Sequence, residues 1–273
     1  MLCTKCRTRP VASTDGRCTR CAALYPSPPN GLMAATPAPA SETWHLLRSP
    51  VGLSKAVVVL LGIVIATDLL AVVAGLNVRS EYTVSTDRMY VTDDAQAHAS
   101  LLYGFAGSLQ TFAMLATAVV FIIWFRRVRL NAEVFDASQQ RMKPGWAIGA
   151  WFVPIGNLWL PRRIAAGIWA ASVRINTDGS WRTVSQTPLN LWWTAWVLSA
   201  IFGRSADRNY AQALMPQEVA DAVVAVMASD ALDIVAAVLA IRFVRKLTAM
   251  QGERAALGAY PLREQPAAGP VPS

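Results

Sequence analysis

The feature that most constrains this chain is a run of 21 almost uninterrupted apolar residues, "AVVVLLGIVIATDLLAVVAGL", at positions 56–76. At about 1.5 Å per helical residue, this run can cross a hydrocarbon core of about 30 Å. Further apolar stretches follow at 101–125, at 189–203 (a shorter one) and at 219–241. Only 15% of the residues are charged, against about a quarter in soluble domains. The sequence therefore predicts an all-α integral membrane protein with four transmembrane helices.

The stretch "FVPIGNLWLPRR" at 152–163 interrupts this pattern. Arg162 and Arg163 at the centre of a span would together cost about 6 kcal/mol, while each apolar neighbour returns only about 0.3–0.6 kcal/mol. A straight span through them is therefore not expected. Pro154 and Asn157 favour a turn, and Pro161 is a favoured residue of a first helical turn. We expect a re-entrant or interfacial helical hairpin, whose second arm lies along the membrane surface.

Charge counting favours the hairpin over a fifth span. With four spans and a hairpin, 21 basic residues lie on the side of the two termini and 4 lie on the other side. With five spans the division is 14 to 9, with 2 buried. Positive charge marks the cytoplasmic side. The alanine-rich, lysine-poor composition is typical of a high-GC bacterial genome, and residues 1–50 contain no signal-peptide stretch. We expect a multi-pass protein of the bacterial inner membrane with both termini in the cytoplasm.

All four cysteines lie near the N-terminus, at Cys3, Cys6, Cys18 and Cys21. Their C-x2-C-x11-C-x2-C spacing can present four thiolates to one Zn²⁺, and an all-sulfur set favours zinc over hard cations. The alternative is a pair of disulfides, but these need an oxidising compartment and a cytoplasmic N-terminus argues against one. The sequence predicts one structural zinc per chain, in a ribbon too small to fold without it.

The domain organisation follows from these features. A zinc-ribbon head at 1–21 is followed by a Pro/Ala-rich linker at 22–43, a membrane domain at 44–251 and a disordered tail at 252–273. Within the membrane domain, Asp93 and Asp94 can cap the second helix. Its periodicity continues past the apolar stretch and predicts a helix that ends only at Pro144.

Three aspartates lie inside apolar stretches. Asp68 lies 12 residues after Ala56 and Asp230 lies 12 residues before Arg242, so both are expected roughly 18 Å deep. Asp233 shares a helical face with Asp230. One interpretation is protonated carboxyls that bond to Thr67, Ser229 or a backbone carbonyl and join helices. The other is a proton or cation site formed by the first and last spans.

Eight of the ten tryptophans fall within 146–196. An aromatic belt at the level of the lipid headgroups would explain most of them, and a ligand pocket is the alternative. The two histidines have no partner at ligand spacing, and the chain contains no G-x-S-x-G, H-E-x-x-H or P-loop pattern. An enzyme is therefore the less favoured class.

The sequence is compatible with two functions. The first is a non-enzymatic scaffold or sensor that couples the zinc ribbon to the lipid bilayer and binds a cytoplasmic protein. Nucleic acid is disfavoured as a partner because the basic head lacks aromatic residues for base stacking. The second is a small transporter or an ion- or proton-conducting protein that uses the intramembrane aspartates. Four spans make a small bundle, so this second function would call for a homo-oligomer.

Four segments in this order resemble a family: "LRSPVGLSKAVVVLLGIVIATDLLAV", "FIIWFRRVRLNAEVF", "KPGWAIGAWFVPIGNLWLPRRIAAGIWAAS" and "DIVAAVLAIRFVRKLTAMQ". They resemble a bacterial membrane family catalogued as domain of unknown function 4328, over roughly residues 46–251. The most specific part is the P-G-W…W-F-V-P-I-x-N-L-W-x-P stretch. The resemblance implies a multi-span membrane domain behind a variable cytoplasmic head. It implies no activity and no site residues.

Overall fold

The computed structural model describes Thr19 and residues 46–87, 93–173 and 184–257. The chain divides into two units, Met1–Thr43 and Trp44–Ser273. Apart from Thr19, every described residue lies in the second unit. The predicted zinc-binding cysteines, the linker and most of the predicted tail therefore lie outside the described residues.

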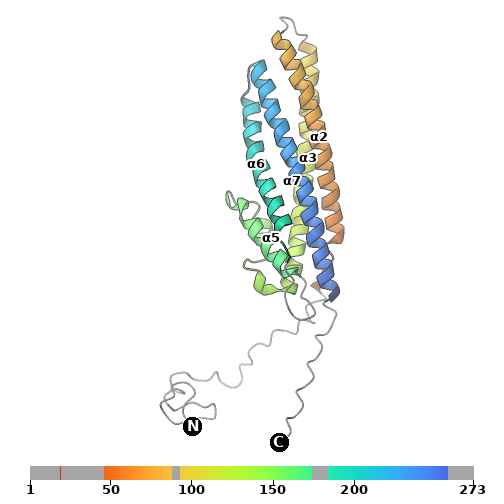
Figure 1. Ribbon diagram of the computed structural model, residues 1–273, viewed down its shortest axis with the longest axis vertical. Coiled ribbons are helices and arrows are strands. Elements are labelled where there is room, and N and C mark those ends of the chain that lie inside the picture. The colour runs from red at the N-terminus through yellow and green to blue at the C-terminus, as the bar shows by residue number, and fades with distance from the viewer. Residues whose placement is uncertain (1–18, 20–45, 88–92, 174–183, 258–273) are drawn as a thin grey trace. The chain divides into compact units, whose positions relative to one another are not determined.

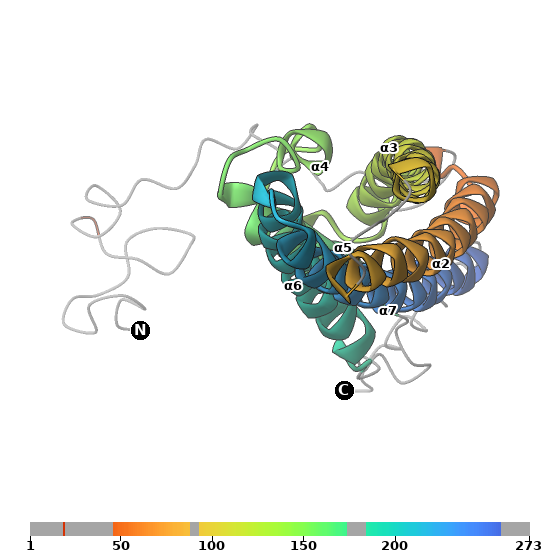
Figure 2. The ribbon, with the colours of Figure 1, turned by 90° about the horizontal axis from the view of Figure 1, so that it is seen from above.

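The described part of the chain contains helices and no strand, as the sequence predicts. In chain order the helices are α2 (Val51–Asp87), α3 (Asp93–Phe135), η3 (Ala137–Gln139), α4 (Trp146–Gly149), η4 (Gly156–Leu158), α5 (Leu160–Ala171), α6 (Thr187–Gln212) and α7 (Pro216–Leu257). The long helices α2, α3, α6 and α7 run side by side (Figure 1). Seen from above, α2 packs against both α3 and α7, and α6 packs against α7 (Figure 2). The short helix α5 lies at one end of this bundle, against α3 and α6.

Among the described helices, three are long and apolar enough to cross a membrane: Val51–Thr83, Asp94–Phe135 and Pro216–Ala256. The predicted fourth span corresponds to α6, which is 26 residues long. Helix α6 is not among the three: polar residues and Pro188 interrupt its first half, and its second half carries the exposed Arg204, Asp207 and Arg208. A membrane protein is thus supported, while a fourth crossing through α6 stays a prediction.

Two helix ends differ from the prediction. Helix α3 ends at Phe135 and not near Pro144, because Asp136 adopts an extended backbone and its carboxylate accepts from the Ser138 backbone N–H at 3.0 Å. The side-chain bond replaces the next backbone bond of the helix and starts the short η3 turn. At the other end of the domain, α7 continues through Leu257. Residues 252–257, assigned to the tail from the sequence, are therefore helical.

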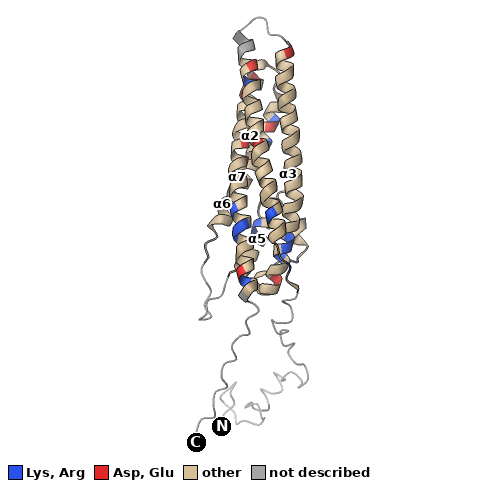
Figure 3. Cartoon of the chain, turned by 90° about the vertical axis from the view of Figure 1, so that its right-hand side faces the viewer, with Lys and Arg blue, Asp and Glu red and all other residues tan. Residues whose placement is uncertain are grey.

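A buried polar network joins the elements at the end of the bundle that carries α5. The Asn131 Nδ2 donates to the Arg48 carbonyl at 2.9 Å and to the Gln251 Oε1 at 3.1 Å. The Gln251 Nε2 donates to the Val128 carbonyl at 2.8 Å and to the Ser172 Oγ at 3.3 Å. These bonds connect α3 and α7 with the residues before α2 and the end of α5. Lys and Arg gather at this same end (Figure 3).

Candidate functional site: a carboxyl pair inside the bundle

Two of the three predicted aspartates meet in the interior of the bundle. Asp68 of α2 is 0% exposed and Asp230 of α7 is 3% exposed. Between them lies Gln110 of α3, whose Nε2 donates to the Asp68 Oδ1 at 2.7 Å and to the Asp230 Oδ1 at 2.9 Å. A side-chain amide has two N–H donors, so this one group satisfies one oxygen of each carboxyl. Three helices therefore converge on one polar cluster.

The other oxygen of each carboxyl accepts no hydrogen bond within the described part of the chain. The Oδ2 atoms of Asp68 and Asp230 are buried and accept no hydrogen bond from the described residues. Thr67, a partner considered from the sequence, instead donates to the Val64 carbonyl at 2.8 Å. Buried polar atoms are rarely left unsatisfied, so these two oxygens are the positions at which a proton, a water molecule or a cation would be bonded.

Asp233 lies close to this cluster but is not joined to it by the amide. It interacts electrostatically with both Asp68 and Asp230, as its position one turn along α7 requires. Helix α6 approaches closely at the same level, since a Cβ added at Gly203 would lie 2.9 Å from the Ser229 Oγ. Small residues allow such close packing of helices in membranes.

Below Asp233, toward the basic end, lies a cavity of about 180 Å³ with apolar and aromatic walls. Phe121, Trp151, Trp192 and Trp196 line it, and Asp233 is the one ionisable group in its lining. The walls come from α2, α3, α6, α7 and the segment around Trp151. The cavity therefore extends from Asp233 toward the basic end as a largely apolar space.

On the opposite side of the cluster the surroundings are more polar. Tyr103 of α3 and the exposed Asp207 of α6 both interact electrostatically with Asp230. The Tyr103 ring contacts the Tyr210 ring edge-on, with centroids 5.5 Å apart. The carboxyl cluster is thus bordered by apolar walls toward the basic end and by hydroxyl and carboxyl groups toward the other end.

Chemically, the pair cannot carry two negative charges without compensation. One ionised aspartate at the centre of a span costs about 2.5–3.5 kcal/mol, and a second charge beside it adds repulsion in a medium that screens poorly. One shared, neutral amide donor does not offset this. The pair therefore needs at least one proton or one bound cation. Among the described residues, no group of three or more His, Cys, Asp or Glu side chains is placed to hold a metal ion.

The predicted hairpin residues lie away from this cluster, at the basic end. Pro154 begins a tight turn in which Ile155 has φ 61° and ψ −45°, close to a γ-turn, and Asn157 lies in η4. A positive φ is strained for a β-branched residue. Pro161 lies in the first turn of α5, as predicted. At 12 residues, α5 is about 18 Å long and too short to cross a membrane.

Arg162 and Arg163, which interrupt the apolar pattern of the sequence, lie at the surface of the bundle. The Arg162 Nη2 donates to the Asn190 Oδ1 at 2.8 Å, near the start of α6. Arg163 is exposed and lines a second cavity, described below. Both arginines lie on α5, at the end of the bundle where Lys and Arg gather (Figure 3).

The tryptophans divide between two environments. Trp146 and Trp159 are 41% and 54% exposed, as an aromatic belt requires. Trp169, Trp192 and Trp193 are at most 5% exposed and pack in the core. Trp192 stacks on Phe243 with centroids 4.5 Å apart. For these three the belt interpretation does not hold, because the rings fill the space between α5, α6 and α7.

Sequence reasoning missed Gln110, the residue that joins the carboxyls. The sequence does contain a feature that points to it, because Gln110 is an amide within the largely apolar stretch 101–125. The expected partners were side chains adjacent to the aspartates in sequence. The partner comes instead from another helix, and residue counting along single helices does not reveal such contacts.

The comparisons with known proteins give one match. A family model with the description "Domain of unknown function (DUF4328)" matches residues 88–249. The matched region contains Gln110 and Asp230 but not Asp68. The chain matches no curated protein and no solved structure.

Proposed function

The chain belongs to the DUF4328 family, and from that premise we propose that it is a membrane-embedded sensor whose Asp68–Gln110–Asp230 cluster binds a proton or a monovalent cation. The observation that carries the proposal is the shared amide of Gln110, which donates to two buried carboxyls at 2.7 and 2.9 Å. Each carboxyl keeps one oxygen to which no residue in the ranges 46–87, 93–173 and 184–257 donates. A proton or a small cation on these oxygens would compensate the negative charge of the pair and would give each oxygen a bonding partner.

Sensing fits the surroundings of the cluster better than conduction. A conducting path needs polar groups or water on both sides of the site. Toward the basic end the cluster borders a cavity whose lining is almost wholly apolar. Toward the other end lie Tyr103 and Asp207. This asymmetry supports a site that a proton or cation reaches only from the end that carries Tyr103 and Asp207. Occupancy of the site would then depend on the pH or the cation concentration at that end.

The bundle offers a route from the site to the cytoplasmic segment. Asp68 lies on α2, and the residues just before α2 are held by Asn131, which bonds both the carbonyl and the backbone N–H of Arg48. A small displacement of α2 would therefore be transmitted to the point where the N-terminal segment joins the bundle. We propose that this segment is a zinc ribbon, held by Cys3, Cys6, Cys18 and Cys21, that binds a cytoplasmic protein.

The cation site is tested by thermal unfolding of the full-length protein in lipid nanodiscs across pH, with Na⁺, K⁺ or choline as the only cation. In choline, raising the pH removes the last proton from the pair and should lower the unfolding temperature by several degrees. A small cation that binds should restore it. Asp68→Asn and Asp230→Asn should flatten both responses, while Asp221→Asn, an exposed position on α7, should leave them unchanged. Identical pH and cation responses in all four proteins would refute the site.

The zinc ribbon is tested separately by elemental analysis of the purified protein. We expect one zinc per chain, lost on Cys→Ser substitution at any of the four positions. Stoichiometric disulfides in place of zinc would contradict both the ribbon and a cytoplasmic N-terminus.

Ion or proton transport is the second candidate, favoured by the same carboxyl pair. It is distinguished by reconstitution into liposomes. Proton or cation flux that depends on Asp68 would establish transport and replace the sensor assignment. Absence of flux together with the cation response described above would support the sensor.

A further inference from the structure

A second cavity, separate from the carboxyl cluster, lies at the basic end of the bundle. It has a volume of about 230 Å³ and lies between α5 and the 139–142 loop that follows η3. Three arginines from three elements line it: Arg129 of α3, Arg141 of the loop and Arg163 of α5. No acidic side chain is among the lining residues.

Arg129 fixes the cavity wall. Its side chain is 2% exposed, its Nη1 contacts the Glu133 Oε2 at 3.1 Å, and its Nη2 donates to the Met142 carbonyl at 2.7 Å. The guanidinium thus ties the loop to α3. Since Glu133 partly neutralises Arg129, the uncompensated charge of the cavity comes from the other two arginines.

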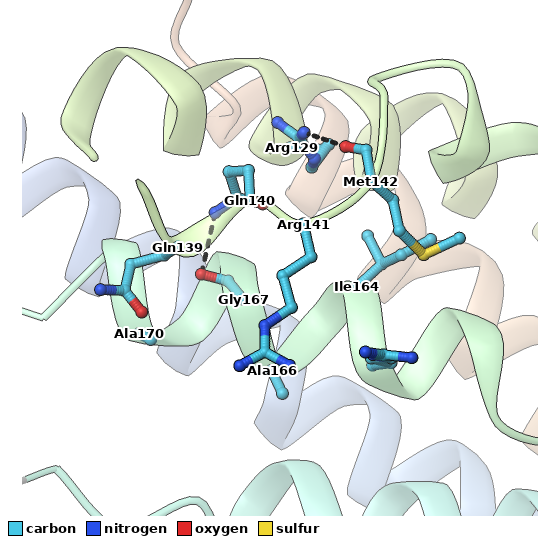
Figure 4. Close-up of a pocket in the computed structure, with 10 residues that line it drawn as sticks. Arg129, Gln139, Gln140, Arg141, Met142, Ile164, Ala166, Gly167 and Ala170 are labelled. Atoms are coloured by element: carbon cyan, nitrogen blue, oxygen red, sulfur yellow. Dashed lines mark hydrogen bonds between the residues drawn. The ribbon is translucent and has the colours of Figure 1, made fainter. Parts of the chain in front are cut away.

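The opposite wall is fixed by a close backbone contact. The Gln140 Nε2 donates to the Gly167 carbonyl at 2.9 Å, and a Cβ added at Gly167 would lie 2.8 Å from the Gln139 carbonyl oxygen. Only glycine allows the loop to approach α5 so closely. Figure 4 shows the Gln140–Gly167 hydrogen bond and the Arg129–Met142 hydrogen bond, with the Arg141 side chain extending from the loop over α5 toward Ala166.

Arg141 and Arg163 are both exposed and have no ion pair or hydrogen bond through their side chains among the described residues. Arginine offers a planar set of donors that fits phosphate oxygens, and basic pockets at the cytoplasmic ends of membrane helices suit anionic lipid headgroups. The 146–159 segment, which directly precedes α5, carries exposed apolar side chains, among them Phe152 and Ile155, both 71% exposed. Such side chains are suited to contact acyl chains beside a bound headgroup.

We propose that this cavity binds a phosphate group, and that its occupant is the headgroup of an anionic phospholipid. The phosphate would lie between the Arg141 and Arg163 guanidinium groups. The amides of Gln139 and Gln140 are available nearby for further polar contacts. The lipid tails would run along the exposed apolar side chains of the 146–159 segment.

The test is a lipid titration of the full-length protein in neutral detergent, followed by native mass spectrometry. Phosphatidylglycerol should bind at least tenfold more tightly than phosphatidylcholine with the same acyl chains. The double variant Arg141→Gln/Arg163→Gln should lose this preference. The control Arg126→Gln/Arg127→Gln removes the same charge from α3 outside the cavity lining and should keep it. Should the double variant unfold, Arg141→Gln alone should weaken phosphatidylglycerol binding several-fold.

Equal retention of phosphatidylglycerol by the wild type and the cavity variants would overturn the proposal. A separate titration with inorganic phosphate distinguishes the source of the anion. If inorganic phosphate binds in an Arg141- and Arg163-dependent way while the lipid preference is absent, the lipid assignment is wrong and the cavity serves a soluble phosphate.

Discussion

At the scale of single residues, two glutamines, the partly buried Gln110 and the buried Gln251, connect helices at two depths of the bundle. Gln110 joins α2, α3 and α7 at the carboxyl pair. Gln251, 1% exposed, joins α7 to α3 and to the end of α5. Each amide bonds to groups that have few other partners. Removing either glutamine side chain should therefore lower the free energy of unfolding by more than the loss of an ordinary hydrogen bond, because its buried partners are left unsatisfied.

Gln251 provides the clearest stability prediction at this scale. Gln251→Ala removes the donor to the Val128 carbonyl and the acceptor for Asn131, and should destabilise the protein by about 1–3 kcal/mol. The matched control is Gln217→Ala on the exposed start of α7, whose side chain donates to Asp221 at 3.3 Å, with an expected change below about 0.5 kcal/mol. Thermal unfolding of both variants measures the difference. Equal losses would mean that the buried network contributes nothing specific.

At the scale of elements, the sequence predicts the helices well and their ends poorly. The apolar runs place α2, α3 and α7 because a membrane span needs about 20 apolar residues. The end of α3 depends on a single local bond from Asp136, which competes with a periodicity that continues beyond it. The equal depth of Asp68 and Asp230 follows from counting residues. That α3 supplies their shared donor, Gln110, depends on tertiary packing. Residue counting along single helices cannot predict this.

The contact of α6 with α7 gives the prediction at the scale of elements. Gly203→Ala should push the Ser229 Oγ away, since the new Cβ would lie 2.9 Å from it, and should destabilise the protein by about 1–3 kcal/mol. Adding Ser229→Ala removes the clashing atom and should recover part of the loss. Gly62→Ala is the control, because a Cβ there meets nothing within 4 Å. If Ser229→Ala worsens the effect, the close approach is not the cause.

At the scale of the whole molecule, the basic residues define one end of the bundle. Arg48, Asn131 and Gln251 meet at this end, so the residues that precede α2 and the end of α7 lie close together. Lys and Arg gather there as well (Figure 3). From the positive-inside rule we propose that this end faces the cytoplasm. If both termini lie on the cytoplasmic side, the chain must cross the membrane an even number of times. Helix α6 would then be the fourth crossing.

Cysteine labelling in intact cells tests this orientation. In a variant with all four native cysteines replaced by serine, a cysteine at Arg174 should resist membrane-impermeant reagents, because that segment is expected in the cytoplasm. A cysteine at Thr86, at the far end of α2, should react. Labelling of both positions from outside would show that residues 146–173 cross the membrane, and labelling of position 174 alone would show the reverse orientation.

The central claim is that the Asp68–Asp230 pair holds a proton or a cation inside the bundle. Infrared spectroscopy of the protein in lipid membranes tests it most directly, because a protonated carboxyl buried in an apolar site gives its own carbonyl-stretch band. With choline as the only cation, we expect this band at neutral pH. It should be lost in the Asp68→Asn/Asp230→Asn double variant, retained in Asp221→Asn, and diminished by a small cation that binds. A spectrum without the band in choline at neutral pH, in wild-type protein that is still folded, would contradict the account.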